Sequence, residues 1–192
     1  MRKTSKAKEH QVLGQVQKSN IDRVFDTLDI TRDGVLGADD FRTMAQRMVA
    51  LREHMEPRLL AEIQGTFAAW WETIRQAADV EGNGHISREE FTAAAARGLD
   101  QDPEYVDKMI RVSEVTFRAA DEEGDGLLTR SQVERIYQAF GVDEALSAET
   151  FRRIDLNGDG TVSIEEFVSA ARDVWTSNDP KAPGAAMFGS VA

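Results

Sequence analysis

Four twelve-residue windows of one pattern recur along the chain, and they constrain its fold more than any other feature. Each window opens with aspartate and has glycine at its sixth position and an apolar residue at its eighth. The windows are DITRDGVLGADD from Asp29, DVEGNGHISREE from Asp79, DEEGDGLLTRSQ from Asp121 and DLNGDGTVSIEE from Asp155. Only glycine enters a positive-φ turn without steric cost, so the sixth position predicts a sharp turn in each window. The repetition predicts one supersecondary unit used four times.

Amphipathic segments lie on both sides of each window. Before the windows, apolar residues recur at spacings of three and four, as in IDRVFDTL (21–28) and YVDKMIRVSEVTFRAA (105–120), which is the pattern of one helix face. A second segment follows each window, anchored by Phe41, Phe91, Val133 or Phe167. Asp102 and Pro103 are expected to cap and begin a helix, and Gly141 to end one. The sequence thus predicts an all-α fold of four helix–loop–helix units.

The apolar eighth positions predict how the units associate. We expect Leu36, Ile86, Leu128 and Val162 to join neighbouring loops through short β-bridges, the first loop with the second and the third with the fourth. This gives a unit of residues 1–98 with loops 29–40 and 79–90. A second unit, residues 99–192, would hold loops 121–132 and 155–166 and a C-terminal tail. A chain of 192 residues with 41% hydrophobic content is long enough to bury a sizeable core.

The charge of the chain favours a cation as its partner. Asp and Glu number 34 against 23 Lys and Arg, and the net charge of −11 argues against broad nucleic-acid binding. The absence of cysteine excludes disulfides, thiolate zinc sites and thiol catalysis.

Neither a membrane span nor a signal peptide is expected. No apolar run approaches the roughly 20 residues that cross a bilayer, and the basic opening MRKTSKAKEHQVLG is not followed by the apolar region of a signal peptide. We expect Arg2, Lys3, Lys6 and Lys8 to form a solvated arm, with contact to an acidic partner or a membrane as the alternative. A monomeric, cytoplasmic protein without membrane or nucleic-acid partners is the prediction.

The chemistry of the loops identifies the cation. Calcium takes about six to eight hard oxygen ligands, and a twelve-residue loop supplies them from positions 1, 3, 5, 7, 9 and 12. The window at Asp155 matches the full motif D-x-[DN]-x-[DN]-G-x5-E. Four such loops with helical flanks resemble the EF-hand family. The long insert between the first two loops (41–78) and the tail DPKAPGAAMFG are similar to the sarcoplasmic calcium-binding protein and calerythrin group. The resemblance implies a compact, high-affinity calcium binder with its hands in two pairs.

The fourth and second loops have the more complete ligand sets. In the fourth loop, the expected ligands are Asp155, Asn157, Asp159, the carbonyl of Thr161, Ser163 and Glu166. In the second loop, they are Asp79, Glu81, Asn83, the carbonyl of His85, Ser87 and Glu90. Glu81 is longer than the usual side chain at position 3, but its carboxylate can reach the ion. We expect His85 to bind through its backbone oxygen, with its imidazole directed outward.

The first and third loops depart from the motif at position 12. The first loop offers Asp29, Thr31, Asp33, the carbonyl of Val35, water at Gly37, and Asp40. Because Asp40 is one methylene shorter than glutamate, a tighter six-coordinate site that tolerates magnesium is expected. The third loop offers Asp121, Glu123, Asp125, the carbonyl of Leu127, Thr129 and Gln132. An amide supplies one neutral oxygen, so this loop is expected to be weak or empty, leaving three calcium sites.

The motifs of the common enzyme classes are missing. We find no phosphate-cradling glycine loop, nucleophile elbow or zinc-type helix motif, so no enzymatic activity is expected. A calcium buffer or transporter is the leading interpretation. The alternative is a sensor that opens a methionine-rich groove to an unidentified protein target, for which six methionines make a poor supply. A third interpretation, apolar small-molecule binding as in photoprotein relatives, would use Trp70 and Trp71, for which core packing is favoured.

Overall fold

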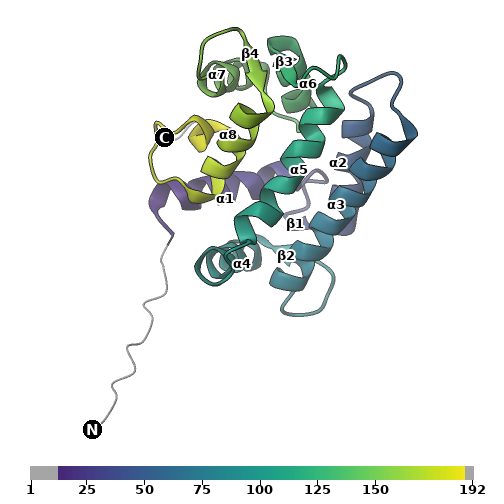
Figure 1. Cartoon of the computed structure of the whole chain (residues 1–192). Helices are drawn as coiled ribbons and strands as arrows, with labels where there is room; N and C mark the ends of the chain where they lie inside the picture. Colours follow the sequence, from purple (N-terminus) through teal and green to yellow (C-terminus); the bar gives the residue numbers. More distant parts are fainter. Residues whose placement is uncertain (1–12, 189–192) are drawn as a thin grey trace.

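The computed structural model describes residues 13–188 and shows the predicted all-α fold (Figure 1). The first four helices are α1 (Gln15–Leu28), α2 (Ala38–Val49), α3 (Pro57–Ala78) and α4 (Arg88–Gln101). The next four are α5 (Tyr105–Ala120), α6 (Arg130–Ala139), α7 (Glu144–Ile154) and α8 (Ile164–Thr176), followed by the 3-10 helix η1 (Pro183–Ala186). The basic arm expected at Arg2, Lys3, Lys6 and Lys8 lies outside the described residues. Between residues 13 and 188, no helix combines the length and apolar character needed to cross a membrane.

Two short antiparallel bridges join the loops in the predicted pairs. Strand β1 (Val35–Leu36) pairs with β2 (Ile86–Ser87), and β3 (Leu127–Thr129) pairs with β4 (Thr161–Ser163). The eighth positions face one another, Leu36 opposite Ile86 and Leu128 opposite Val162, and all four side chains are fully buried. The bridges therefore hold neighbouring loops side by side, which confirms the pairing expected from the sequence.

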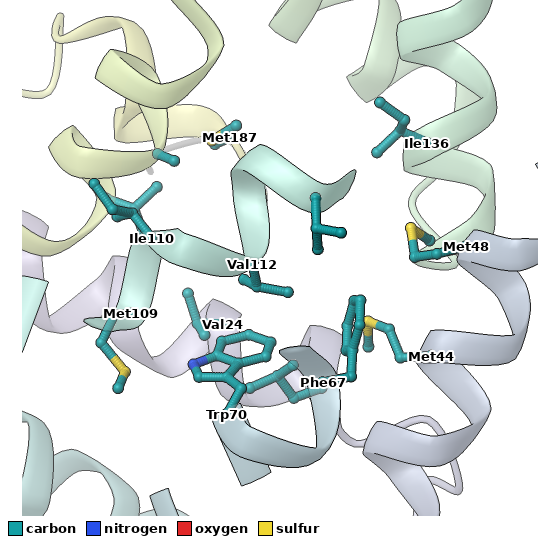
Figure 2. Packing of buried hydrophobic residues seen from close by; sticks show 14 of the residues in the cluster. Val24, Met44, Met48, Phe67, Trp70, Met109, Ile110, Val112, Ile136 and Met187 are labelled. Carbon is teal, nitrogen blue, oxygen red and sulfur yellow. The ribbon is translucent and has the colours of Figure 1, made fainter. Parts of the chain in front are cut away.

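The core is one apolar cluster to which both halves of the chain contribute. Helix α3 packs against α5, and α1 packs against α8. Figure 2 shows Phe67 and Trp70 of α3 beside Val112 of α5, with Met44 and Met48 of α2 nearby. The division of the chain into residues 1–98 and 99–192 remains a prediction. The buried cluster contains residues from both of these parts.

The C-terminal tail packs onto the helices. Gly184 lies so close to α8 that an added Cβ would stand 1.9 Å from the carbonyl oxygen of Ala170. Ala185 and Met187 are buried, and the ring of Phe188 meets that of Phe140 edge-on with 6.3 Å between centroids. The side chain of Gln17 donates a hydrogen bond to the carbonyl of Trp175, which ties α1 to the end of α8. The tail thus covers apolar surface between α1, α7 and α8.

One expected helix start is wrong. Helix α5 begins at Tyr105, and Asp102 ends α4 instead of capping α5. The Asp102 carboxylate accepts the N–H of Glu104 at 2.9 Å, which places Pro103 in a tight turn. The ring of Tyr105 packs directly on Gly98, because a Cβ added to Gly98 would stand only 2.2 Å from Cδ2 of Tyr105. This close packing of α4 on α5 sets the corner. The predicted stop at Gly141 is confirmed, since α6 ends at Ala139 and Gly141 has φ +76°.

Candidate metal sites

The first aspartate of every loop is held inside the turn by backbone N–H groups. In the first loop, the Asp29 carboxylate accepts hydrogen bonds from the N–H groups of Asp33 at 3.2 Å and Gly34 at 3.0 Å. Asp79, Asp121 and Asp155 each accept the N–H of the position-6 glycine in the same way, at 3.0 to 3.1 Å. These glycines have φ between +77° and +86°, the turn predicted from the sequence. An anionic oxygen pair therefore lies at the same place in each loop.

The closing carboxylate of the fourth loop bridges the loop and its exit helix. Oε2 of Glu166 accepts the N–H and the hydroxyl of Ser163, both at 2.9 Å, and Oε1 accepts the N–H of Leu156 at 3.0 Å. Burial works to raise the pKa of Glu166, but these hydrogen bonds outweigh it and hold the pKa below its ordinary value. The group is kept anionic where the motif requires a calcium ligand.

The second loop holds a buried oxygen without a partner. Oε2 of Glu90 accepts the N–H and hydroxyl of Ser87 at 2.9 and 2.8 Å, and these bonds lower the pKa of the carboxyl. Oε1 of Glu90 is buried and has no hydrogen-bond partner among the described residues. The backbone N–H of Val80, which donates to the carbonyl of Ala78 at 2.8 Å, also helps to lower the pKa of this carboxyl. An unpaired anionic oxygen inside the loop suits a cation.

The first loop closes on Asp40 in the position that Glu166 takes in the fourth. Oδ1 of Asp40 accepts the N–H of Thr31 at 3.0 Å, and Oδ2 accepts the N–H of Gly37 at 2.8 Å. The side chain is buried, with 2% exposure. Position 4 of this loop is Arg32, which has φ +57°, a conformation that glycine occupies in the other three loops. The carboxylate of Asp40, although shorter than that of glutamate, thus accepts a backbone N–H of the loop with each of its two oxygens.

The third loop is satisfied from within by Gln132. Its Oε1 accepts the N–H and hydroxyl of Thr129 at 2.7 and 2.8 Å, and its Nε2 donates to Oε2 of Glu123 at 2.8 Å. The amide orientation is fixed, because the backbone N–H of Thr129 can only donate and must face the oxygen. Gln132 therefore presents a donor to the loop and engages the position-3 carboxylate. The sequence indicated a weakened site but not this internal hydrogen bond.

The middle positions of the loops also contact one another. In the fourth loop, Asp159 accepts the N–H and hydroxyl of Thr161 and the side-chain amide of Asn157, and these bonds lower the pKa of Asp159. In the second loop, the amide of Asn83 donates to Glu81 at 3.2 Å. The side chains at positions 3 and 5 therefore meet in both loops.

The His85 side chain lies beside the neighbouring loop. A Cβ built on Gly37 would stand 3.6 Å from Nδ1 of His85. The backbone N–H of His85 donates to Oδ1 of Asn83 at 2.8 Å. The imidazole thus extends across the β1–β2 bridge, an orientation that suits the expected role of the His85 carbonyl as the ligand.

Carboxylates alone do not complete the sites. Within residues 13–188, no group of three or more His, Cys, Asp or Glu side chains is gathered as a metal centre would require. The ligand sets expected from the sequence also draw on amide, hydroxyl and backbone carbonyl oxygens, and all the expected donors are oxygen atoms. An oxygen-only donor set of mixed charge fits calcium and, in a smaller site, magnesium.

Comparisons with known proteins cover all four loops. The family models for an EF-hand domain pair match residues 1–48 and 111–172, and an EF-hand model matches residues 76–94. The chain is 30% identical over 149 residues to the Arabidopsis thaliana protein named probable calcium-binding protein CML34, covering 77% of this chain and 92% of that protein. It is 23% identical to calerythrin of Saccharopolyspora erythraea, covering 82% and 91%.

Solved structures share the architecture. A Streptomyces coelicolor calcium-binding protein, whose structure is described as the structural basis for its prokaryotic calcium-mediated regulation, superposes with a TM-score of 0.73 and 28% identity, covering 83% of this chain and 98% of that one. A sarcoplasmic calcium-binding protein from amphioxus has a TM-score of 0.71 at 20% identity, covering 94% and 100%.

Some relatives are longer than this chain. It spans 62% of an uncharacterised calcium-binding protein of Caenorhabditis elegans and 28% of calcium-dependent protein kinase 21 of Arabidopsis thaliana. The matches that span nearly whole proteins agree with the loops and their pairing. The chain belongs to the EF-hand family of calcium-binding proteins, with calerythrin among its relatives.

Proposed function

We propose that this protein binds three calcium ions, in the first, second and fourth loops, and acts as a calcium buffer. The observation that carries the proposal is the contrast at position 12. Asp40, Glu90 and Glu166 place a carboxylate there, and Gln132 places an amide whose N–H₂ group is already hydrogen-bonded to Glu123. A calcium ion needs anionic oxygen at this position, and only the third loop lacks it.

The proposed sites use the ligand positions of the motif, with departures from its residue types at Thr31, Asp40 and Glu81. In the second and fourth loops the carboxylates at positions 1 and 12 are joined by acid or amide side chains at positions 3 and 5. In the first loop Thr31 and Asp33 take those positions. The remaining ligands would be the carbonyls of Val35, His85 and Thr161 at position 7, and at position 9 Ser87, Ser163 and, in the first loop, water at Gly37. The third loop would serve as the folded partner of the fourth through the β3–β4 bridge.

The distribution of methionine supports a buffer over a sensor. Met44, Met48, Met109 and Met187 are at most 4% exposed and pack within the single core shared by both halves (Figure 2). A sensor exposes a methionine-rich groove when calcium binds, and here that exposure would require breaking the packing of α3 on α5.

We expect calcium to change the exposed apolar surface little. Titration with calcium in the presence of a solvatochromic dye should raise the dye fluorescence by less than about twofold, because the methionines stay inside the core. Calmodulin-like opening would instead give a large rise that saturates with the calcium sites. That outcome would favour the sensor and require a target.

Magnesium should compete best at the first loop. Asp40 reaches its two backbone partners with a shorter side chain than glutamate, which favours a small six-coordinate site. Adding millimolar magnesium to the calcium-free protein should shift the NMR signal of Gly34 before those of Gly84 and Gly160. The Asp40→Glu variant should lose this preference. A first response at Gly84 or Gly160 would show that the length of Asp40 does not set the selectivity.

A second candidate function, binding of a small neutral molecule, is favoured by one cavity. The cavity measures about 60 Å³ and lies among α1, α3, α5, α6, α8 and the tail, with Met187 and Phe188 in its wall. Three residues that line it carry buried polar atoms without hydrogen-bond partners in the described chain: Nε1 of Trp70, Oγ1 of Thr116 and the hydroxyl of Tyr137. A buried donor left unpaired costs about 1–3 kcal/mol, so an occupant with an acceptor oxygen would be stabilised here.

The size of the cavity sets the test. A cavity of about 150 Å³ takes benzene, so an aromatic occupant requires extra room. Substituting Met187→Ala should provide it, and phenol should then shift the indole N–H signal of Trp70. Benzene, which has nearly the same shape but no acceptor oxygen, should shift that signal much less. Equal responses to the two compounds, or none, would remove this candidate without affecting the calcium proposal.

A further inference from the structure

The third loop is contacted by a segment from the other half of the chain. Residues 50–56, which connect α2 to α3, place Arg52 against the end of α5. Nε of Arg52 donates to the carbonyl of Ala119 at 2.7 Å, and Nη2 donates to the carbonyls of Arg118 and Asp121. Asp121 is the first residue of the third loop. One guanidinium therefore binds three carbonyls where α5 ends and the loop begins.

Further contacts lie near Arg52. Arg135 of α6 donates to the carbonyl of Leu51 at 3.3 Å and pairs with Glu122 of the loop at 2.7 Å. Arg118 of α5 forms a two-pronged pair with Glu62 of α3. Exposed ion pairs of this kind contribute little individually. The contacts of Arg135 link the connection between α2 and α3 to the third loop, and the Arg118–Glu62 pair joins α5 to α3 in the same surface groove.

The position of Arg52 is favourable for a cation. Carbonyls in the last turn of a helix lack intrahelical partners, and the helix dipole concentrates negative charge there. At the second loop the comparable contact is one hydrogen bond from Arg97 to the carbonyl of Ala77, made within the same half of the chain. Multiple capping by an arginine from the other half sets the third loop apart from the second.

We propose that the third loop is an internal docking site for the α2–α3 connection, and that Arg52, instead of a metal ion, is the cation that organises it. Docking and calcium binding at this loop then oppose each other, since a calcium ion beside the guanidinium would add like charge at Asp121. Linkage makes this opposition reciprocal: calcium forced into the loop weakens docking, and removing Arg52 strengthens calcium binding.

The proposal explains why the third loop keeps its fold without the carboxylate at position 12. Gln132 closes the loop from inside through Glu123, and Arg52 holds it from outside through the carbonyl of Asp121. The loop remains a partner for the fourth through β3–β4, and the same contacts fasten the α2–α3 connection to the C-terminal half. Its role becomes structural, joining the two halves independently of calcium.

A set of four proteins tests the opposition: the parent, Gln132→Glu, Arg52→Gln and the double variant. Occupancy of the third loop is followed by the NMR signal of Gly126 during calcium titration. Gln132→Glu supplies the missing carboxylate and should create a weak fourth site. In the double variant, the third loop should bind calcium about tenfold more tightly than in Gln132→Glu alone, as judged from the Gly126 signal. A tenfold change lies in the usual range of coupling free energies between linked sites. Equal affinity in these two proteins would overturn the proposal.

A matched control separates docking from net charge. Arg58 lines the same surface groove as Arg52 but makes no hydrogen bond to the loop within the described chain. Adding Arg58→Gln to Gln132→Glu should change the Gly126 affinity by less than about twofold. A tenfold effect from Arg58→Gln would contradict a specific role for Arg52.

Hydrogen exchange tests docking without any metal. In calcium-free protein, Arg52→Gln should speed amide exchange in residues 50–56 and 121–126 together, and Arg58→Gln should not. Unchanged exchange in Arg52→Gln would overturn the docking site. The opposition between docking and calcium rests on the proposed function, that is, on calcium binding by the EF-hand loops. The signals of Gly34, Gly84 and Gly160 test that function separately. If they do not respond to calcium, the proposed function fails, and the hydrogen-exchange result still decides whether Arg52 docks the connection.

Discussion

Removing calcium should lower the free energy of unfolding by about 8 kcal/mol. A ligand at about a hundredfold its dissociation constant stabilises the folded protein by about 2.7 kcal/mol per site, and three sites are proposed. The physical reason is charge: in the three loops, nine carboxylates lie at ligand positions and repel one another without a cation. For a chain of this length, each kcal/mol shifts the midpoint of thermal unfolding by about 2–4 °C, so chelation should lower the midpoint by about 16–32 °C.

Thermal unfolding followed by circular dichroism, with and without a calcium chelator, measures this shift. Addition of excess calcium to the chelated sample should restore the original midpoint, which controls for effects of the chelator. A difference of only a few degrees would mean that the loops are not occupied tightly, and the buffer proposal would fail.

Glu166→Gln should weaken calcium binding at the fourth loop by about a hundredfold, or about 2.8 kcal/mol. The variant removes one anionic ligand from a loop that otherwise matches the full motif. Its fold should survive, because the same amide already closes the third loop: Gln132 accepts hydrogen bonds from Thr129 as Glu166 does from Ser163. The loss should therefore be confined to metal binding.

Glu165→Gln is the matched control for this variant. Glu165 precedes Glu166 in the first turn of α8, carries the same charge and is exposed. Calorimetric titration of the two variants should show the fourth site weakened only in Glu166→Gln. Similar affinities in both would mean that Glu166 is not a ligand.

Local features of the fold were predictable from the sequence. The turn at the sixth position requires glycine, so Gly160 alone predicts it. The apolar eighth position, such as Val162, predicts the pairing of loops that are neighbours in the chain. The start of α5 was not predictable in the same way. Asp102 and Pro103 form a plausible cap and first residue, but the packing of Tyr105 against Gly98 decides where the helix begins.

Contacts between distant segments had no local signal. The weakness of the third loop follows from the identity of Gln132, yet the hydrogen bond to Glu123 depends on the orientation of an amide that sequence does not reveal. Arg52 contacts residues that lie 66 to 69 positions further along the chain. An arginine in a polar connection is ordinary on its own, and only the folded chain places it on the end of α5.

Calcium stoichiometry, resolved loop by loop, tests the account most directly. Isothermal titration calorimetry gives the number of ions, and the NMR signals of Gly34, Gly84, Gly126 and Gly160 assign each ion to its loop. The account predicts three ions. The signals of Gly34, Gly84 and Gly160 should shift as their loops fill, and the signal of Gly126 should show no calcium binding at the third loop. Four tightly bound ions with a saturating shift at Gly126, or fewer than three ions, would contradict it.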